Sequence, residues 1–359
     1  MTFTVNEIDT GSAEPSAGGR GVMRDRLFGP TGLRVSELFL GAMTFAGPDE
    51  ADEMIGLYAD AGGNVIDTAS AYGDSEEVLG RLLRHRRDRF VLATKFTLTR
   101  DARDPNAGGS HRKNLTLSLE ASLRRLRTDY IDLFWVHTRD EHTPIEESMR
   151  ALDDAVRAGK VLYVGASNLP AWLVSRANTL AEWRDWNPFA GIQVPYSLLK
   201  RDIERELLPM AEAYGMNVAT YGALAGGVLS GKYTGPGGAP SGTRFDPASL
   251  TARDHRAARA VRQVAEELGV TASQVAIAWT RTRSPAVHPI IGSRDVAQLR
   301  DNLGALDVAL PADAVDRLDS AVEFDPGYPT DFTTGPRPWL FGDREPLLDG
   351  RAHQTRRRR

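Results

Sequence analysis

Four polar side chains that could together protonate a carbonyl group follow three consecutive apolar runs of the chain. Asp67 ends the run V-I-D, Lys95 ends V-L-A-T-K and His137 ends L-F-W-V-H. Tyr72 comes five residues after the aspartate. Tyrosine has a reference pKa of about 10, which a neighbouring ammonium lowers by stabilising the phenolate, and a carboxylate can hold that ammonium in place. We therefore predict that Tyr72 protonates a carbonyl oxygen beside His137, while a nicotinamide, which no side chain can replace, delivers hydride.

Eight short runs rich in β-branched and aromatic residues alternate with amphipathic segments. We predict strands at 38–41, 65–67, 90–95, 131–137, 161–167, 191–194, 217–221 and 287–291. We predict helices at 50–61, 75–84, 113–126, 144–158, 171–182, 201–213, 255–268, 272–283 and 296–303. This alternation indicates parallel strands joined by crossover helices, in a closed barrel or an open doubly wound sheet. Eight strands, without G-x-G-x-x-G after the first, favour a single-domain α/β fold, the (β/α)8 TIM barrel.

The barrel is predicted to span residues 23–323. A Gly/Ser/Pro-rich leader (1–22) and a basic tail (350–359) are predicted to be disordered, and an aromatic-rich segment (324–349) is predicted to cover one rim of the barrel. We also predict a mobile loop near 234–247.

The composition excludes several classes of function. Lys+Arg 44 against Asp+Glu 48 gives a net charge of −4, which predicts no general attraction to nucleic acid or acidic membranes. The absence of cysteine excludes disulfides, thiolate catalysis and thiolate metal sites. No apolar run reaches the ~20 residues of a membrane span, and no secretory signal starts the chain, so we expect a cytoplasmic protein. Nothing in the sequence indicates a homo-oligomer.

The sequence around the four polar residues resembles the aldo-keto reductase superfamily, in particular its bacterial and potassium-channel-β-like branch. The likeness covers roughly residues 25 to 320 and is carried by FGPTGLRVSELFLGAMTFAG, NVIDTASAYGDSEEVLGRLL, SLRRLRTDYIDLFWVHTRD, VRAGKVLYVGASNL and PIIGSRDVAQLRDNLGAL. It implies that Tyr72 is the general acid, that Asp67 and Lys95 tune it, and that His137 positions the carbonyl.

The resemblance also implies an NADPH/NADP+ site. Ser167, Asn168 and Gln193 match positions that bind the nicotinamide carboxamide, and Tyr221 matches the aromatic residue that stacks on its ring. Further implied cofactor contacts are Gly41, Met43, Gly222, Leu224, Gly227, Lys232, Gly292, Ser293, Arg294, Gln298 and Asn302. Arg294 favours NADPH over NADH, because a guanidinium pairs well with the 2′-phosphate.

The substrate is predicted to be a small aldehyde or ketone of apolar or aromatic character. Its contacts would be Tyr72, His137, Phe45 and Phe96, with walls from Met43 and the C-terminal aromatic residues Phe324, Tyr328, Phe332, Trp339 and Phe341. The resemblance implies that histidine at position 137, where relatives that reduce an enone double bond carry glutamate, favours carbonyl reduction. A sugar enoyl or keto reductase of a biosynthetic pathway stays an alternative.

Three other functions use the same residues. Lys95 could form a Schiff base in an aldolase, or Asp67 and His137 could bind a metal in a hydrolase. Neither explains Tyr72 or the predicted carboxamide site, and we predict no metal. The third alternative function is a cofactor-binding sensor or auxiliary subunit with little turnover, like the potassium-channel β subunits. His111 and His288 are interpreted as incidental.

Overall fold

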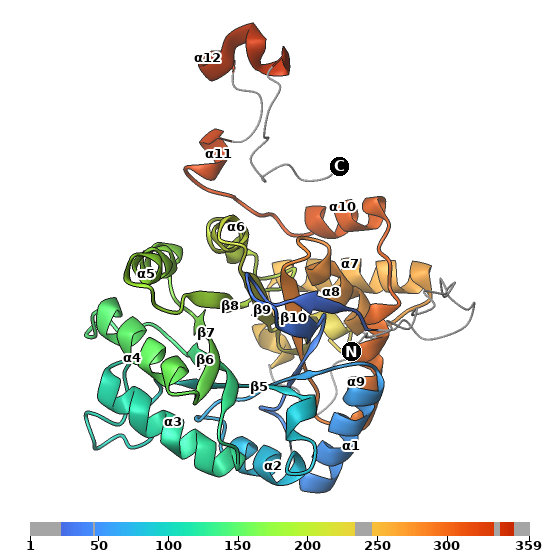
Figure 1. Ribbon diagram of the computed structural model, residues 1–359. Helices are drawn as coiled ribbons and strands as arrows, with labels where there is room; N and C mark the ends of the chain where they lie inside the picture. The colour runs from blue at the N-terminus through green and yellow to red at the C-terminus, as the bar shows by residue number, and fades with distance from the viewer. Residues whose placement is uncertain (1–22, 46, 234–245, 334–337, 348–359) are drawn as a thin grey trace, which may run out of the picture.

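The computed structural model describes residues 23–45, 47–233, 246–333 and 338–347. Eight parallel strands close into a barrel in the order β10-β3-β4-β5-β6-β7-β8-β9 (Figure 1). They are β3 (Phe39–Gly41), β4 (Val65–Asp67), β5 (Val91–Phe96), β6 (Ile131–Val136), β7 (Val161–Ser167), β8 (Phe189–Pro195), β9 (Asn217–Tyr221) and β10 (Val287–Gly292). The predicted (β/α)8 barrel is confirmed. The predicted leader, most of the predicted mobile loop and the basic tail lie outside the described residues.

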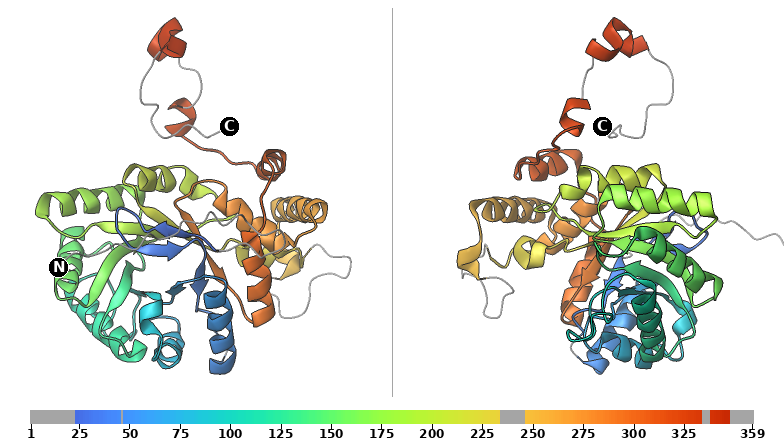
Figure 2. Two further views of the ribbon diagram at one scale, coloured as in Figure 1. Left: turned by 45° about the vertical axis from the view of Figure 1, so that its right-hand side comes forward. Right: turned by 90° about the vertical axis from the view of Figure 1, so that its left-hand side faces the viewer.

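Nine helices cover the outer surface of the barrel within the described chain (Figure 2). They are α1 (Pro48–Asp60), α2 (Ser75–Leu82), α3 (Arg112–Leu126), α4 (Ile145–Arg157), α5 (Ala171–Arg184), α6 (Leu207–Ala213), α7 (Ala252–Leu268), α8 (Ala272–Arg281) and α9 (Val296–Leu303). Capping boxes start α7 at Thr251 and α8 at Thr271, where each threonine side chain accepts a backbone N–H. None of the described helices has the length and apolar character needed to cross a bilayer.

The predicted helix 201–213 is interrupted. A 3-10 turn occupies Asp202–Glu204, and α6 begins only at Leu207. Arg201 is 5% exposed and bonds to Glu204 through Nε at 2.8 Å and Nη2 at 2.9 Å. This inward-facing ion pair favours the tight turn, so the continuous amphipathic pattern overestimates the length of the helix.

A hairpin that the sequence analysis missed closes the amino end of the barrel. Its strands, β1 (Asp25–Leu27) and β2 (Arg34–Ser36), pair antiparallel, and Phe28 between them is fully buried. The Phe28 ring meets the Trp135 ring edge-on at 6.3 Å inside the barrel. A Cβ at Gly165 would lie 2.3 Å from the Trp135 ring, so glycine there leaves room for it. Because this end is filled, the open end is at the carboxyl termini of the strands.

His288, interpreted as incidental from the sequence, ties the hairpin region to the barrel. It is fully buried on β10, with Nδ1 3.1 Å from the Ser36 carbonyl oxygen and Nε2 2.6 Å from Asn217 Nδ2. Asn217 Oδ1 also accepts the Gly29 N–H at 3.0 Å, which fixes the orientation of the amide. The histidine must therefore donate from Nδ1 and accept at Nε2, the pattern of a neutral ring. Burial, with a smaller effect of Arg26 and Arg281, lowers its pKa to about 4.

We expect this histidine to make the fold acid-sensitive. Its pKa is about 4 in the folded chain and 6.5 as a model value, so the unfolded chain binds the extra proton between these pH values. The free energy of unfolding should therefore fall as pH drops from 6.5 towards 4, by about 3 kcal/mol from His288 alone. Urea unfolding across this range would measure it. His288→Gln, which can keep both hydrogen bonds without titrating, should give a shallower pH dependence, and an unchanged slope would contradict the assignment.

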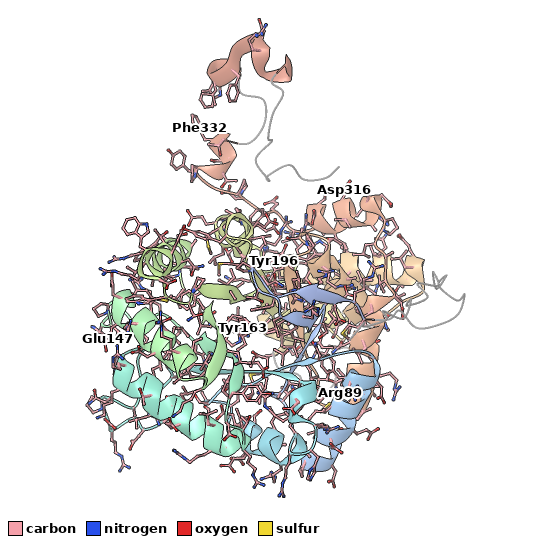
Figure 3. The ribbon with its side chains drawn as sticks, in the orientation of Figure 1. Arg89, Glu147, Tyr163, Tyr196, Asp316 and Phe332 are labelled. Carbon is pink, nitrogen blue, oxygen red and sulfur yellow. The ribbon has the colours of Figure 1, made fainter. Side chains whose placement is uncertain are left out.

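Residues 324–349 were predicted to cover one rim of the barrel, and the described part of this segment does not. α10 (Ala312–Ser320), which was not predicted, packs beside α7, and α11 (Thr330–Thr333) and α12 (Pro338–Phe341) extend away from the barrel (Figures 1 and 2). The Phe324 ring lies 4.7 Å from the guanidinium of Arg201 and 5.1 Å from that of Arg205, which directs the chain outward. Phe332 lies on this outer segment and is 60% exposed (Figure 3).

Candidate active site

A cavity of about 700 Å³ lies at the carboxyl ends of the barrel strands. Three of the four predicted catalytic residues, Asp67, Tyr72 and His137, line it. Every predicted cofactor contact also lines it: Gly41, Met43, Ser167, Asn168, Gln193, Tyr221, Gly222, Leu224, Gly227, Lys232, Gly292, Ser293, Arg294, Gln298 and Asn302. The fold thus brings residues from seven barrel strands and their loops to one site, as expected for a barrel of this kind.

Lys95 lies beneath the cavity as half of a buried ion pair. Its side chain is fully buried, and Nζ donates to Asp67 Oδ2 at 2.6 Å and to the Thr68 carbonyl oxygen at 2.7 Å. Burial lowers the pKa of Lys95, and the Asp67 carboxylate opposes that shift. The other carboxylate oxygen, Asp67 Oδ1, accepts from Gln193 Nε2 at 2.8 Å. Both members of the pair are therefore held by several hydrogen bonds, as a buried pair requires.

Tyr72 lies over this pair, with its ring centroid 4.8 Å from Lys95 Nζ. The sequence analysis expected the lysine to lower the pKa of the phenol. Instead, burial and then the Asp67 carboxylate raise the pKa of Tyr72 above its ordinary value. The shift is opposite to the expected one because burial disfavours the charged phenolate and the nearby Asp67 carboxylate repels it. The phenol is consequently protonated at neutral pH, the form that can donate a proton.

His137 stands beside Tyr72, with ring centroids 5.9 Å apart and planes at 82°. Burial and, to a lesser degree, the Lys95 ammonium lower its pKa to about 4, so the ring is neutral at pH 7. Nδ1 is buried and has no hydrogen-bond partner among the described residues. No described side chain therefore orients the imidazole through this nitrogen.

The residues predicted to bind a carboxamide form one hydrogen-bonded group at the ends of β7, β8 and β9. Asn168 Nδ2 donates to Ser167 Oγ at 3.0 Å, and the Tyr221 hydroxyl donates to Asn168 Oδ1 at 2.9 Å. Gln193, through its bond to Asp67, links this group to the buried ion pair. Tyr221 is 37% exposed, so part of its ring is accessible from the cavity.

Basic and backbone groups from the loops after β9 and β10 also line the cavity. After β9, Gly227 has φ 97°, and a Cβ there would lie 2.4 Å from Lys232 Nζ, so the lysine crosses close over this glycine. After β10, Asn302 Nδ2 donates to Ser293 Oγ at 3.1 Å. Asp295 caps α9 by accepting the Gln298 N–H at 2.8 Å. Two cationic side chains, Lys232 and Arg294, line the cavity and therefore suit it to anions.

Two predicted substrate contacts do not line the cavity. Phe96 is fully buried and stacks on Phe134 with ring centroids 5.0 Å apart. Side chains alternate along a strand, so Phe96 faces the helices where Lys95 faces the barrel interior. Phe45 packs against the main hydrophobic core. None of the described C-terminal aromatic residues lines the cavity either, and these wall predictions are wrong.

The cavity also has lining residues that the sequence analysis missed: Thr44, Ala223, Gly226, Ser230, Ser273, Ile277, Ile290, Ile291 and Asp301. Thr44 Oγ1 donates to the Ser293 carbonyl oxygen at 2.6 Å and so joins the loops after β3 and β10. Ser273 and Ile277 belong to α8, and no sequence signal places that helix against the cavity. Because side chains alternate along a strand, the sequence of β10 could have identified one of its two isoleucines as a lining residue.

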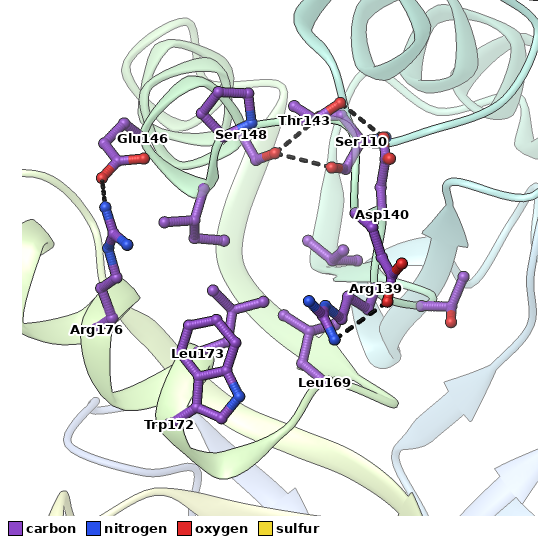
Figure 4. Close-up of a pocket in the computed structure, with 15 residues that line it drawn as sticks. Ser110, Arg139, Asp140, Thr143, Glu146, Ser148, Leu169, Trp172, Leu173 and Arg176 are labelled. Carbon is purple, nitrogen blue, oxygen red and sulfur yellow. Dashed lines mark hydrogen bonds and ion pairs between the residues drawn. The ribbon is translucent and has the colours of Figure 1, made fainter.

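A second cavity, of about 280 Å³, lies on the outer side of the segments that follow β6 and β7 (Figure 4). Its charged side chains are paired with one another, Arg176 with Glu146 and Arg139 with Glu141. Asp140 accepts from Thr143 Oγ1 at 2.6 Å and from the Ser110 N–H at 2.8 Å. The described residues contain no group of three or more metal-ligating side chains.

The chain matches the model of the aldo/keto reductase family over residues 37–323. The chain belongs to this family. It is 38% identical to norsolorinic acid reductase of Aspergillus flavus over 320 residues, which cover 84% of this chain and 81% of that protein. It is 35% identical to an aryl-alcohol dehydrogenase of Pestalotiopsis microspora over 329 residues, 86% and 85% of the two chains. It is 37% identical to aldo-keto reductase AusK of Emericella nidulans over 333 residues, 86% and 84% of the two chains.

This membership confirms the resemblance seen in the sequence. This aldo/keto reductase is an oxidoreductase that acts on carbonyl or alcohol groups. Membership of the family therefore decides against the aldolase and metal-hydrolase alternatives, which used the same Lys95, Asp67 and His137. The family generally uses a nicotinamide cofactor. The residues of the cofactor site in each member decide between NADPH and NADH.

Proposed function

We propose that this aldo/keto reductase reduces aryl aldehydes or ketones to alcohols with NADPH, and that Tyr72 is the general acid. The observation that carries the proposal is the placement of the Tyr72 ring 5.9 Å from the His137 ring and 4.8 Å from Lys95 Nζ, above the buried Lys95–Asp67 pair. The aryl character of the substrate is supported by relatives named for aryl alcohols and for norsolorinic acid.

The cavity fits a nicotinamide dinucleotide. Its lining combines the hydrogen-bonding side chains of Ser167, Asn168 and Gln193 and the ring of Tyr221 with the cationic side chains of Lys232 and Arg294. A Cβ at Gly222 or Gly292 would have no atom within 4 Å, so backbone groups there are open to an approaching ligand. We assign the carboxamide to Ser167, Asn168 and Gln193, and the phosphates to the loops after β9 and β10.

Each polar residue near Tyr72 then has one role. A nicotinamide cofactor held by Ser167, Asn168 and Gln193 would supply the hydride. Tyr72 donates its proton to the carbonyl oxygen, and His137, being neutral, offers one N–H that orients the same oxygen. The Lys95 ammonium stabilises the phenolate that remains, and Asp67 holds the lysine at 2.6 Å.

The direct test combines cofactor titration with a substrate panel. NADPH binding would be followed by quenching of tryptophan fluorescence, and NADPH oxidation would be followed after adding aryl and aliphatic aldehydes and ketones. We expect oxidation that depends on the carbonyl compound and favours aryl substrates. Tight NADPH binding without oxidation by any member of the panel would instead favour a sensor or a narrow sugar reductase.

Arg294→Ala should weaken NADPH binding by about 10- to 100-fold and leave NADH binding nearly unchanged, because only NADPH carries a 2′-phosphate for the guanidinium to bind. Fluorescence titration with both cofactors would measure the two dissociation constants. Arg300→Ala is the matched control, since Arg300 lies on α9, the helix that follows Arg294, is exposed and does not line the cavity. An equal loss for both cofactors in Arg294→Ala would contradict the 2′-phosphate assignment.

A further inference from the structure

The peptide groups of His137 are held by side chains from both neighbouring strand ends. The backbone N–H of His137 donates to two acceptors. One is Thr97 Oγ1, 3.2 Å from the backbone nitrogen, and the other is the Phe96 carbonyl oxygen, at 3.1 Å. Asn168 Nδ2 donates to the His137 carbonyl oxygen at 2.9 Å. Thr97 follows β5 and Asn168 follows β7, the two strands that flank β6. The main chain of His137 is thus fixed from both sides.

Both holding residues have a positive φ, 104° at Thr97 and 54° at Asn168. Asparagine adopts such values more readily than most residues, whereas a β-branched residue there is an outlier. Arg127 and Asp185, at φ 53° and 54°, end helices α3 and α5, where a left-handed residue is ordinary. Thr97 ends no helix and is 5% exposed, so its surroundings must impose the conformation.

The loop after β5 provides that constraint. The Thr97 carbonyl oxygen accepts the Gly109 N–H at 2.8 Å, which closes the loop 98–108 onto Thr97. The next residue, Ser110, is bonded through its N–H to Asp140 and through its side chain and carbonyl oxygen to Ser148 Oγ (Figure 4). The loop is therefore anchored next to Thr97, and the positive φ lets the Thr97 hydroxyl face His137 while its carbonyl faces the loop.

This arrangement matters because none of the described residues forms a hydrogen bond with the imidazole. His137 Nδ1 has no partner in the described part of the chain, so the ring is placed by its own main chain and by packing against Tyr72. We propose that Thr97 is a positioning residue, whose strained backbone and hydroxyl fix the His137 peptide and thereby aim the imidazole at the substrate carbonyl. The inference rests on the proposed carbonyl reduction.

Three substitutions separate the effect of the Thr97 hydroxyl on kcat from the effect of the strained Thr97 backbone. Thr97→Val keeps the shape but loses the acceptor, and we expect kcat for an aryl aldehyde to fall about 10-fold, since small misplacements of catalytic groups cost 10- to 100-fold. Thr97→Ser keeps the acceptor and should retain kcat within about 2-fold. Thr97→Gly should raise the unfolding temperature by relieving the positive φ and still lower kcat. The Kd for NADPH should not change in any of them.

Arg127→Gly is the matched control, because it relieves a positive φ at the end of α3 without touching His137. It should raise stability and leave kcat unchanged. A second readout does not depend on activity: the 15N-detected imidazole signals of His137, assigned through His137→Asn, should shift or broaden in Thr97→Val and Thr97→Gly but not in Thr97→Ser.

Unchanged kcat and unchanged His137 signals in Thr97→Val would overturn the proposal. So would a loss of kcat that merely follows a loss of folded protein or of NADPH affinity. Failure of the proposed function would look different, because the unaltered protein would then not oxidise NADPH with any carbonyl compound. In that case the imidazole signals alone would still decide whether Thr97 positions His137.

Discussion

Replacing Tyr72 by phenylalanine should reduce carbonyl reduction by about 10²- to 10⁴-fold, the contribution typical of a positioned general acid. The phenol lies edge-on to the His137 ring in the cavity, and burial and Asp67 keep its proton bound at neutral pH. The aromatic ring stays in place over Lys95, so NADPH affinity and stability should change little. Steady-state NADPH oxidation and a fluorescence titration of the cofactor would measure the two effects separately.

Tyr130→Phe is a matched control for this substitution. Tyr130 also loses one hydroxyl, which bonds to Asp88 at 3.2 Å outside the cavity, and its removal should leave turnover unchanged. Near-normal turnover by Tyr72→Phe would show that another group supplies the proton. A loss of NADPH affinity in parallel with turnover would instead indicate that the substitution disturbs the whole cavity.

Replacing Lys95 by methionine should combine the loss of turnover with a large loss of stability. Asp67 would be left as a buried carboxylate without its partner, which costs about 3–5 kcal/mol in comparable pairs. The unpaired carboxylate would also raise the pKa of Tyr72 further, and no cation would stabilise the phenolate. Urea unfolding would measure the stability and NADPH oxidation the turnover.

The double variant Lys95→Met/Asp67→Asn separates these two consequences. The asparagine removes the buried charge and can still accept from Gln193, so most of the stability should return while turnover stays low. Lys160→Met is the control, because Lys160 pairs with Glu120 at the surface, where such a pair is worth about 0–1 kcal/mol. Equal stability of Lys95→Met and the unaltered protein would mean that the Lys95–Asp67 pair is not charged.

The sequence by itself determined the alternation of strands and helices, and with it the barrel and the positions of Asp67, Lys95 and His137. The reason is that each strand is a local apolar run, and parallel closure places every strand end at one face. The same rule explains why Ser167, Gln193 and the other predicted cofactor contacts line one cavity. The strand-end positions of Asp67, Lys95 and His137 follow from local periodicity and one topological step, whereas the cofactor contacts were predicted from the resemblance to the family.

Only the tertiary structure decided the features that arise from contacts between distant segments. The break before α6 depends on Arg201 facing inward, and the outward course of the C-terminal segment depends on Phe324 meeting two guanidinium groups. The pKa of Tyr72 is raised rather than lowered because its phenol is buried and, to a lesser degree, because the Asp67 carboxylate lies nearby. Burial, and the partner that each charge finds there, follow from the packing of the whole barrel, which no local pattern encodes.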